Sequence, residues 1–192
     1  MTRHAIIPLS LLLLLLAGCQ EAPAPAEAAP AIATLSPVER GQYLVDVGGC
    51  HDCHTPWTMQ ENGPGPDLTR ALSGHPADLE MPDPPAPVGP WIVASAATNT
   101  AHAGPWGVSF TANLTPHDET GLGTWTTETF IATIRNGRHM GRGRPLLPPM
   151  PYFNYAKATD EDLAAIFAYL QTVPAIDNRV PSPRPPRLAQ AQ

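Results

Sequence analysis

The sequence has 192 residues, which is enough for one domain with appendages and too few for most multidomain enzymes. Its 25 prolines and 15 glycines exclude a fold dominated by long unbroken helices or strands, while a hydrophobic share of 43% supplies a modest core and argues against wholesale disorder. With 11 basic and 17 acidic residues, the net charge of −6 has the wrong sign for a protein whose main partner is a nucleic acid.

Residues 1–18 have the features of a secretory signal peptide. Arg3 and His4 precede an apolar run over residues 5–17, which contains six consecutive leucines and is followed by small residues. A permanent transmembrane anchor is the alternative, but this run is interrupted by Pro8 and is shorter than the roughly 20 residues that a spanning helix needs. The pattern therefore favours export.

The end of this segment, Leu16-Ala17-Gly18-Cys19, resembles the lipobox of bacterial lipoproteins. That resemblance implies that Cys19 becomes the lipidated first residue and anchors the chain to a membrane of a bacterial cell envelope, facing the periplasm or the cell surface. The alternative is an ordinary signal peptide with an incidental cysteine.

Composition then predicts the domain organisation. Residues 19–35 form a flexible tether rich in alanine and proline, because such a composition cannot bury a core. A single domain follows over residues 36–178. Residues 179–192 are a proline-rich tail that we expect to be disordered or laid along the surface.

Three helices are predicted within the domain. Each begins at a serine or threonine that can cap its first turn, carries an apolar stripe with helical spacing, and ends at a glycine or before a proline. The predicted helices run from Ser36 to Gly48, from Thr126 to Gly137 and from Thr159 to Pro174. Residues 55–123 contain proline at short intervals and no convincing period, so they are expected to be irregular.

The first predicted helix leads directly into Cys50-His51-Asp52-Cys53-His54, a C-x-x-C-H motif of the kind that attaches haem c. Two thiols at this spacing can add to the two vinyl groups of a porphyrin, and the adjacent histidine can bind the iron. The motif therefore predicts one covalent haem c, held by Cys50 and Cys53 and ligated by His54.

Other uses of these cysteines fit the sequence less well. A tetrahedral zinc site needs four ligands, and no further cysteine lies in the domain. A thioredoxin-like redox pair would be expected beside a βαβ pattern, which is absent. A simple disulfide between Cys50 and Cys53 would leave His54 without a role.

Around this motif the chain resembles the class I cytochromes c. A closer resemblance is to the cytochrome subunits of bacterial alcohol, aldehyde and related dehydrogenases, and it rests on Phe110–Pro116, Gly121–Trp125, Met150–Tyr155 and Thr159–Asp162 within residues 37–174. The resemblance implies an all-α fold, in which a few helices and long irregular loops surround one haem. It also implies redox partners, with a dehydrogenase as electron donor and a cytochrome or oxidase as acceptor.

Met150 is the predicted sixth ligand of the iron. It sits in Leu147-Pro148-Pro149-Met150-Pro151, a proline-stiffened segment that resembles the axial methionine loop of the family. The alternatives are an open site or one of the other side chains that can bind iron, namely Met59, Met81, Met140, His75, His102, His117 and His139.

Two further groups are expected around the haem. The second ring nitrogen of His54 should donate to a backbone carbonyl, that of Pro66 or that of Pro116. The arginines that could bind the haem propionates, or instead form a solvated loop or a docking patch, are Arg135, Arg138, Arg142 and Arg144.

These expectations define an electron carrier that is not itself an enzyme. It would shuttle one electron at a time, taking electrons from a dehydrogenase and passing them toward a respiratory chain. The alternative is a haem enzyme or sensor with an open or displaceable sixth site.

Overall fold

The computed structural model describes residues 35–86 and 90–186. The predicted signal peptide, Cys19 and the tether up to residue 34 lie outside these ranges. Within them, no helix combines the length and the hydropathy that a membrane span requires.

The three predicted helices are confirmed, with their caps. In α1 (Pro37–Val47), Ser36 and Glu39 form a complete capping box. In α3 (Thr127–Asn136), Thr126 caps the first turn and Gly137 ends the helix with a φ of 60°, a left-handed conformation that suits glycine. In α5 (Asp160–Leu170), the Thr159 side chain accepts from the backbone N–H of Asp162.

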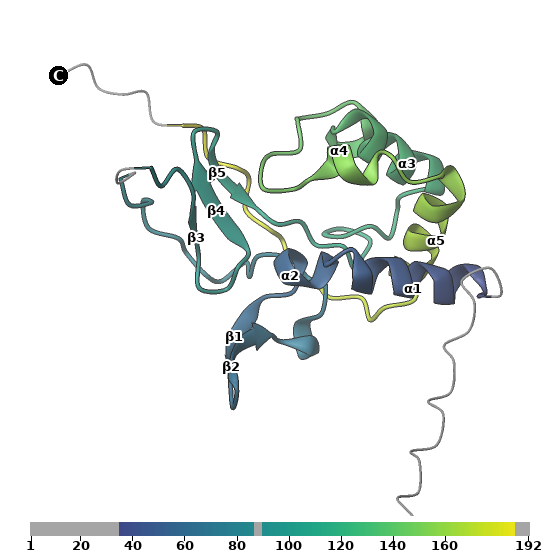
Figure 1. Ribbon diagram of the computed structural model, residues 1–192, viewed down its shortest axis with the longest axis horizontal. Helices are drawn as coiled ribbons and strands as arrows, with labels where there is room; N and C mark the ends of the chain where they lie inside the picture. The colour runs from purple at the N-terminus through teal and green to yellow at the C-terminus, as the bar shows by residue number, and fades with distance from the viewer. Residues whose placement is uncertain (1–34, 87–89, 187–192) are drawn as a thin grey trace, which may run out of the picture. The chain divides into compact units, whose positions relative to one another are not determined.

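Helices α1 and α5 pack so closely that their contact requires glycine (Figure 1). A Cβ atom at Gly41 would lie 1.9 Å from the backbone oxygen of Ala165. Around this contact a hydrophobic core forms from residues of α1, α3, α5 and the loops between them. Its buried members are Val45, Leu72, Leu122, Phe130, Ile134, Leu163, Ile166, Phe167 and Leu170.

Two short helices and two 3-10 turns complete the helical part. Helix α2 (Cys50–His54) follows α1 almost without a break, and α4 (Tyr152–Tyr155) precedes α5. The 3-10 turns are η2 (Leu68–Arg70) and η3 (His139–Gly141).

The expected all-α fold is wrong, because the domain also contains two small antiparallel sheets. Strands β1 (Trp57–Gln60) and β2 (Gly63–Pro66) form a hairpin. Strands β3 (Ala94–Ser95), β4 (Ala101–Gly104) and β5 (Gly107–Phe110) form a sheet in that order. All five lie in the stretch expected to be irregular. They have two to four residues each, too few for an alternating pattern, and β2 reads Gly-Pro-Gly-Pro.

The C-terminal segment runs back beside β5, in yellow in Figure 1. The backbone N–H and carbonyl groups of Val108 and Arg184 exchange two hydrogen bonds of 2.9 Å, so Arg184 continues the sheet beyond β5. The Arg184 guanidinium donates to the carbonyls of Met81 and Pro82. Asn178 ties the same segment to the loop after η2, because its side-chain amide donates to the carbonyls of Ser73 and His75.

Candidate cofactor site

Helix α2 is held at both ends. At its start, Gly49 adopts a φ of 66° as N-cap, and the carbonyl of Gly48 accepts a hydrogen bond from the Tyr155 hydroxyl. At its end, the carbonyl of His54 accepts from the backbone N–H of Gly74 at 2.8 Å. Asn99 adds a hydrogen bond of 2.7 Å from its side chain to the carbonyl of Asp52. Hydrogen bonds from three separate parts of the chain therefore hold the helix that carries the C-x-x-C-H motif.

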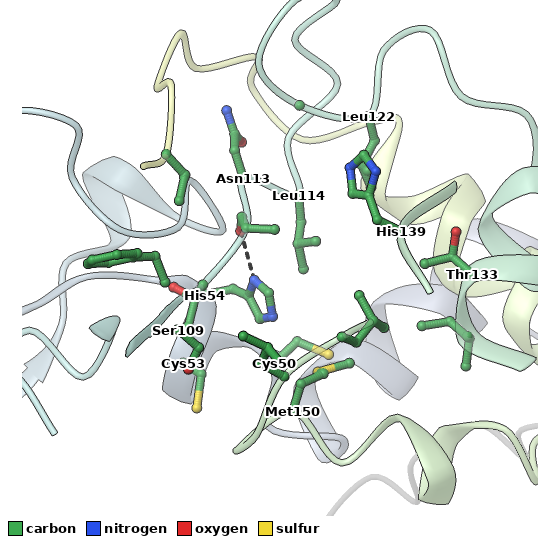
Figure 2. A pocket seen from close by; sticks show the side chains of 18 of the residues that line it. Cys50, Cys53, His54, Ser109, Asn113, Leu114, Leu122, Thr133, His139 and Met150 are labelled. Carbon is green, nitrogen blue, oxygen red and sulfur yellow. Dashed lines mark hydrogen bonds between the residues drawn. The ribbon is translucent and has the colours of Figure 1, made fainter. Parts of the chain in front are cut away.

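A cavity of about 390 Å³ lies against this helix, a volume in the usual range for small-molecule and cofactor sites. The predicted site residues Cys50, Cys53, His54 and Met150 all line it. Figure 2 shows His54, Cys50 and Met150 turned toward the same space. The structure thus brings together two segments about 100 positions apart in the sequence, and core side chains such as Leu122, Phe130 and Ile134 supply much of the remaining wall.

The orientation of His54 is set by a backbone carbonyl, although not one of those expected. Its Nδ1 lies 2.8 Å from the carbonyl oxygen of Ala112 (dashed in Figure 2), so the expectation of Pro66 or Pro116 is wrong. Desolvation lowers the pKa of His54, partly offset by this bond to Ala112. A neutral imidazole with its Nδ1 proton engaged presents Nε2 as a free ligand atom.

Both motif cysteines are free thiols. Burial raises the pKa of Cys50 to about 11, and the nearby carboxylates of Asp46 and Asp52 add to the effect. Burial also raises the pKa of Cys53, again with a contribution from Asp52. Two cysteine thiols and an unprotonated histidine on one short helix are the residues that would hold a covalently attached porphyrin, so this set fits haem c.

Among the methionines in the described ranges, Met150 alone lines the cavity. Met59 on β1 is 76% exposed and Met140 in η3 is 48% exposed. The Met150 loop turns tightly, since the backbone N–H of Met150 donates to the carbonyl of Leu147 at 3.3 Å. Its Pro148–Pro149 peptide bond is cis.

The histidines named as alternatives separate into two groups. His75, His102 and His117 do not line the cavity: the first two are buried and the third is partly buried, and Nδ1 of each lies within hydrogen-bond distance of a serine or threonine hydroxyl. His139 does line it, with its ring edge-on to Trp125 at a centroid distance of 5.3 Å.

The candidate arginines also differ. Arg135 is engaged by Asp160 and the carbonyl of Ala156, and Arg138 donates to the carbonyl of Gly143. Neither of these nor Arg142 lines the cavity, whereas Arg144 does. Arg179 also lines it and pairs with Glu119 at 3.4 Å. Sequence reasoning missed Arg179 and its neighbours, because they lie in the expected tail.

No protein-family model matches the chain. It is 31% identical over 172 residues to the fructose dehydrogenase cytochrome subunit of Gluconobacter japonicus, covering 89% of this chain and 28% of that subunit. It is 29% identical over 132 residues to the gluconate 2-dehydrogenase cytochrome c subunit of Pantoea cypripedii, covering 69% of this chain and 22% of the relative. It is 27% identical over 134 residues to the cytochrome c subunit of the quinone-dependent alcohol dehydrogenase of Gluconobacter oxydans, covering 69% of this chain and 20% of that subunit.

A short helix with a C-x-x-C-H motif, facing a methionine loop across a cavity, is an arrangement typical of a cytochrome c domain. The similarities show that this chain carries a cytochrome c-type domain, related to the cytochrome subunits of bacterial dehydrogenases. The chain spans less than a third of the length of each relative named above.

Proposed function

We propose that this chain is an electron-transfer protein with one covalently attached haem c, for which Cys50 and Cys53 are the attachment sites and His54 and Met150 the iron ligands. The observation that carries the proposal is the meeting of the C-x-x-C-H helix and the Met150 loop at one cavity. When bound, the haem supplies a one-electron couple between ferric and ferrous iron. We propose one haem because these 192 residues contain a single C-x-x-C-H motif.

The protein's own residues orient and enclose this group. Ala112 fixes the imidazole plane of His54 through its carbonyl. Leu122, Phe130, Ile134 and the other apolar lining residues would surround the haem with side chains that do not hold water. Arg144 and Arg179 line the same cavity, so they are the cations available to the haem propionates.

The physiological role we propose is that of a non-catalytic electron carrier. In this proposal it accepts electrons from a dehydrogenase, the kind of enzyme that the names of its relatives mention. It then passes them toward a respiratory chain through a cytochrome or oxidase. We further propose that the chain is exported and that Cys19 carries a lipid, which would place the domain at the surface of a bacterial membrane facing the periplasm or the cell exterior.

A haem enzyme or sensor is the second candidate, and one observation favours it. His139 and Arg144 both line the cavity and lie close enough to interact electrostatically, so two polar side chains are available from which a distal site could be formed. A displaceable sixth ligand would then let a small molecule reach the iron.

Attachment and ligation are tested together on protein produced with a haem-attachment system. Cys50→Ala and Cys53→Ala should each leave at most one thioether, because each removes one thiol. Met150→Ala should abolish the near-infrared sulfur-to-iron band and lower the reduction potential, since the thioether ligand favours ferrous iron. Met140→Ala is the matched control, because that side chain lies in the neighbouring loop and does not line the cavity.

Mass spectrometry of the purified protein and its absorption spectrum measure these outcomes. A wild-type mass without added haem would contradict the cofactor. An unchanged near-infrared band in Met150→Ala would move the sixth ligand elsewhere. Rapid binding of carbon monoxide to the reduced wild type would favour the enzyme or sensor.

A further inference from the structure

One stretch of chain contacts both sides of the cavity. The carbonyl of Ala112 accepts from Nδ1 of His54 at 2.8 Å. Three residues earlier, the hydroxyl of Ser109 donates to the carbonyl oxygen of Pro148 at 2.6 Å, two positions before Met150. The segments that carry the two proposed iron ligands are therefore both hydrogen-bonded to residues 109–112.

Ser109 is itself firmly held. It lies in β5, where it pairs with His102 of β4, and the adjacent Val108 is bonded on the other edge to Arg184. Its side chain is only 7% exposed and lines the cavity. The hydroxyl has one proton, and its distance to Pro148 O is shorter than the 3.2 Å to His102 O, so the bond to Pro148 is the stronger one.

Residues 147–151, the Met150 loop, make few other hydrogen bonds, although Met150 itself packs against the hydrophobic core. Within the described ranges, every other hydrogen bond found for residues 147–151 joins positions three apart in the sequence. These local bonds shape the turn but do not join it to distant residues. Of the hydrogen bonds found for residues 147–151, the one from the Ser109 hydroxyl joins the loop to a distant part of the domain.

We propose that Ser109 is a positioning residue for Met150. It fixes the methionine loop to the same stretch that orients His54, and so maintains the separation of the two ligand-bearing segments. This inference rests on the His54 and Met150 ligation proposed above. Ser109 lies in β5, a strand that the all-α expectation did not include. In this proposal the strand helps to keep Met150 in place as an iron ligand.

The test measures how readily imidazole displaces the methionine in the ferric protein. Loss of one net hydrogen bond predicts that Ser109→Ala binds imidazole about fivefold more tightly than wild type. Ser109→Thr keeps the hydroxyl and should return the affinity to within about twofold of wild type. Ser73→Ala is the matched control: Ser73 is 2% exposed and its hydroxyl donates to the carbonyl of Arg70 at 2.8 Å, away from the methionine loop.

The near-infrared band of the wild type separates the two levels of the proposal. If the band is present and Ser109→Ala binds imidazole no more tightly than Ser73→Ala, the role of Ser109 is wrong while His/Met ligation stands. If the wild type lacks the band, the ligation fails and the inference fails with it. A gain confined to Ser109→Ala, reversed in Ser109→Thr, supports both.

Discussion

His75 is a fully buried histidine whose environment favours the neutral form. Its Nε2 lies 3.1 Å from the carbonyl of Leu79, so Nε2 carries the proton and Nδ1 accepts from the Thr100 hydroxyl at 2.9 Å. Burial lowers the pKa of His75, against smaller opposing effects of the Leu79 carbonyl and Asp78. As the pH falls, His75 therefore takes up a proton at a higher pH in the unfolded chain than in the folded one.

This difference in the pKa of His75 between the folded and unfolded chain predicts that stability depends on pH. The contribution of neutral His75 is complete above pH about 6.5, the ordinary value, and declines as the pH falls below it toward the folded pKa. His75→Gln should reduce the loss of unfolding free energy between pH 7.5 and pH 5, by at most about 1.4 kcal/mol per pH unit. Urea unfolding followed by circular dichroism measures it. A variant that loses as much stability as the wild type over this range would contradict the assignment.

Individual site residues could be predicted from the sequence where the chemistry of haem attachment fixes their spacing. Cys50, Cys53 and His54 could be proposed because haem attachment needs them within five residues, and Met150 because prolines flank it. The structure places all four at one cavity. The acceptor for His54 could not, since any residue supplies a carbonyl and only the path of the chain beyond β5 brings Ala112 to it.

Where α1 crosses α5, the space at Gly41 is too small for any side chain. Gly41→Ala would place a methyl group against the backbone of Ala165, so the helices must separate. We expect a loss of about 1–3 kcal/mol in the free energy of unfolding, the usual cost of overpacking. Gln42→Ala is the control on the exposed side of α1 and should change stability by less than about 0.5 kcal/mol. Equal stability of the two variants, measured by urea unfolding, would show that this contact is looser than described.

The helices and the strands differ in how much of the sequence signal for them lies within the element itself. The helices could be predicted because their caps and apolar stripes lie within the helices themselves. The sheets could not, because β5 is stabilised by pairing with β4 and with Arg184, which is 76 positions away from Val108. Short strands with distant partners leave almost no periodic signal.

For the molecule as a whole, the cavity is closed by a segment that composition alone assigned to a tail. Residues 179–183 line it, and Arg184 and Asn178 tie this segment to β5 and to the loop after η2. The proline-rich composition predicted a tail that is disordered or laid along the surface. It does not reveal that extended proline-rich chain can pair at the edge of a sheet.

Removal of residues 179–192 should therefore open the cavity. We expect the shortened haem protein to bind imidazole faster than the full chain, by about tenfold if the segment contributes of the order of 1.4 kcal/mol to closure. A chain ending at Pro186 retains the lining residues and serves as the control. Stopped-flow absorption measures the rates. Equal rates for both shortened chains would mean that the segment does not restrict access.

The burial of the Cys50 thiol limits when a porphyrin can be attached. With a pKa of about 11, only about one Cys50 side chain in ten thousand is a thiolate at pH 7. The fully folded chain would thus be a poor substrate for its own maturation. Thioether formation is expected to precede final compaction, on a polypeptide whose C-x-x-C-H motif is still open to solvent and to the enzymes that deliver the cofactor.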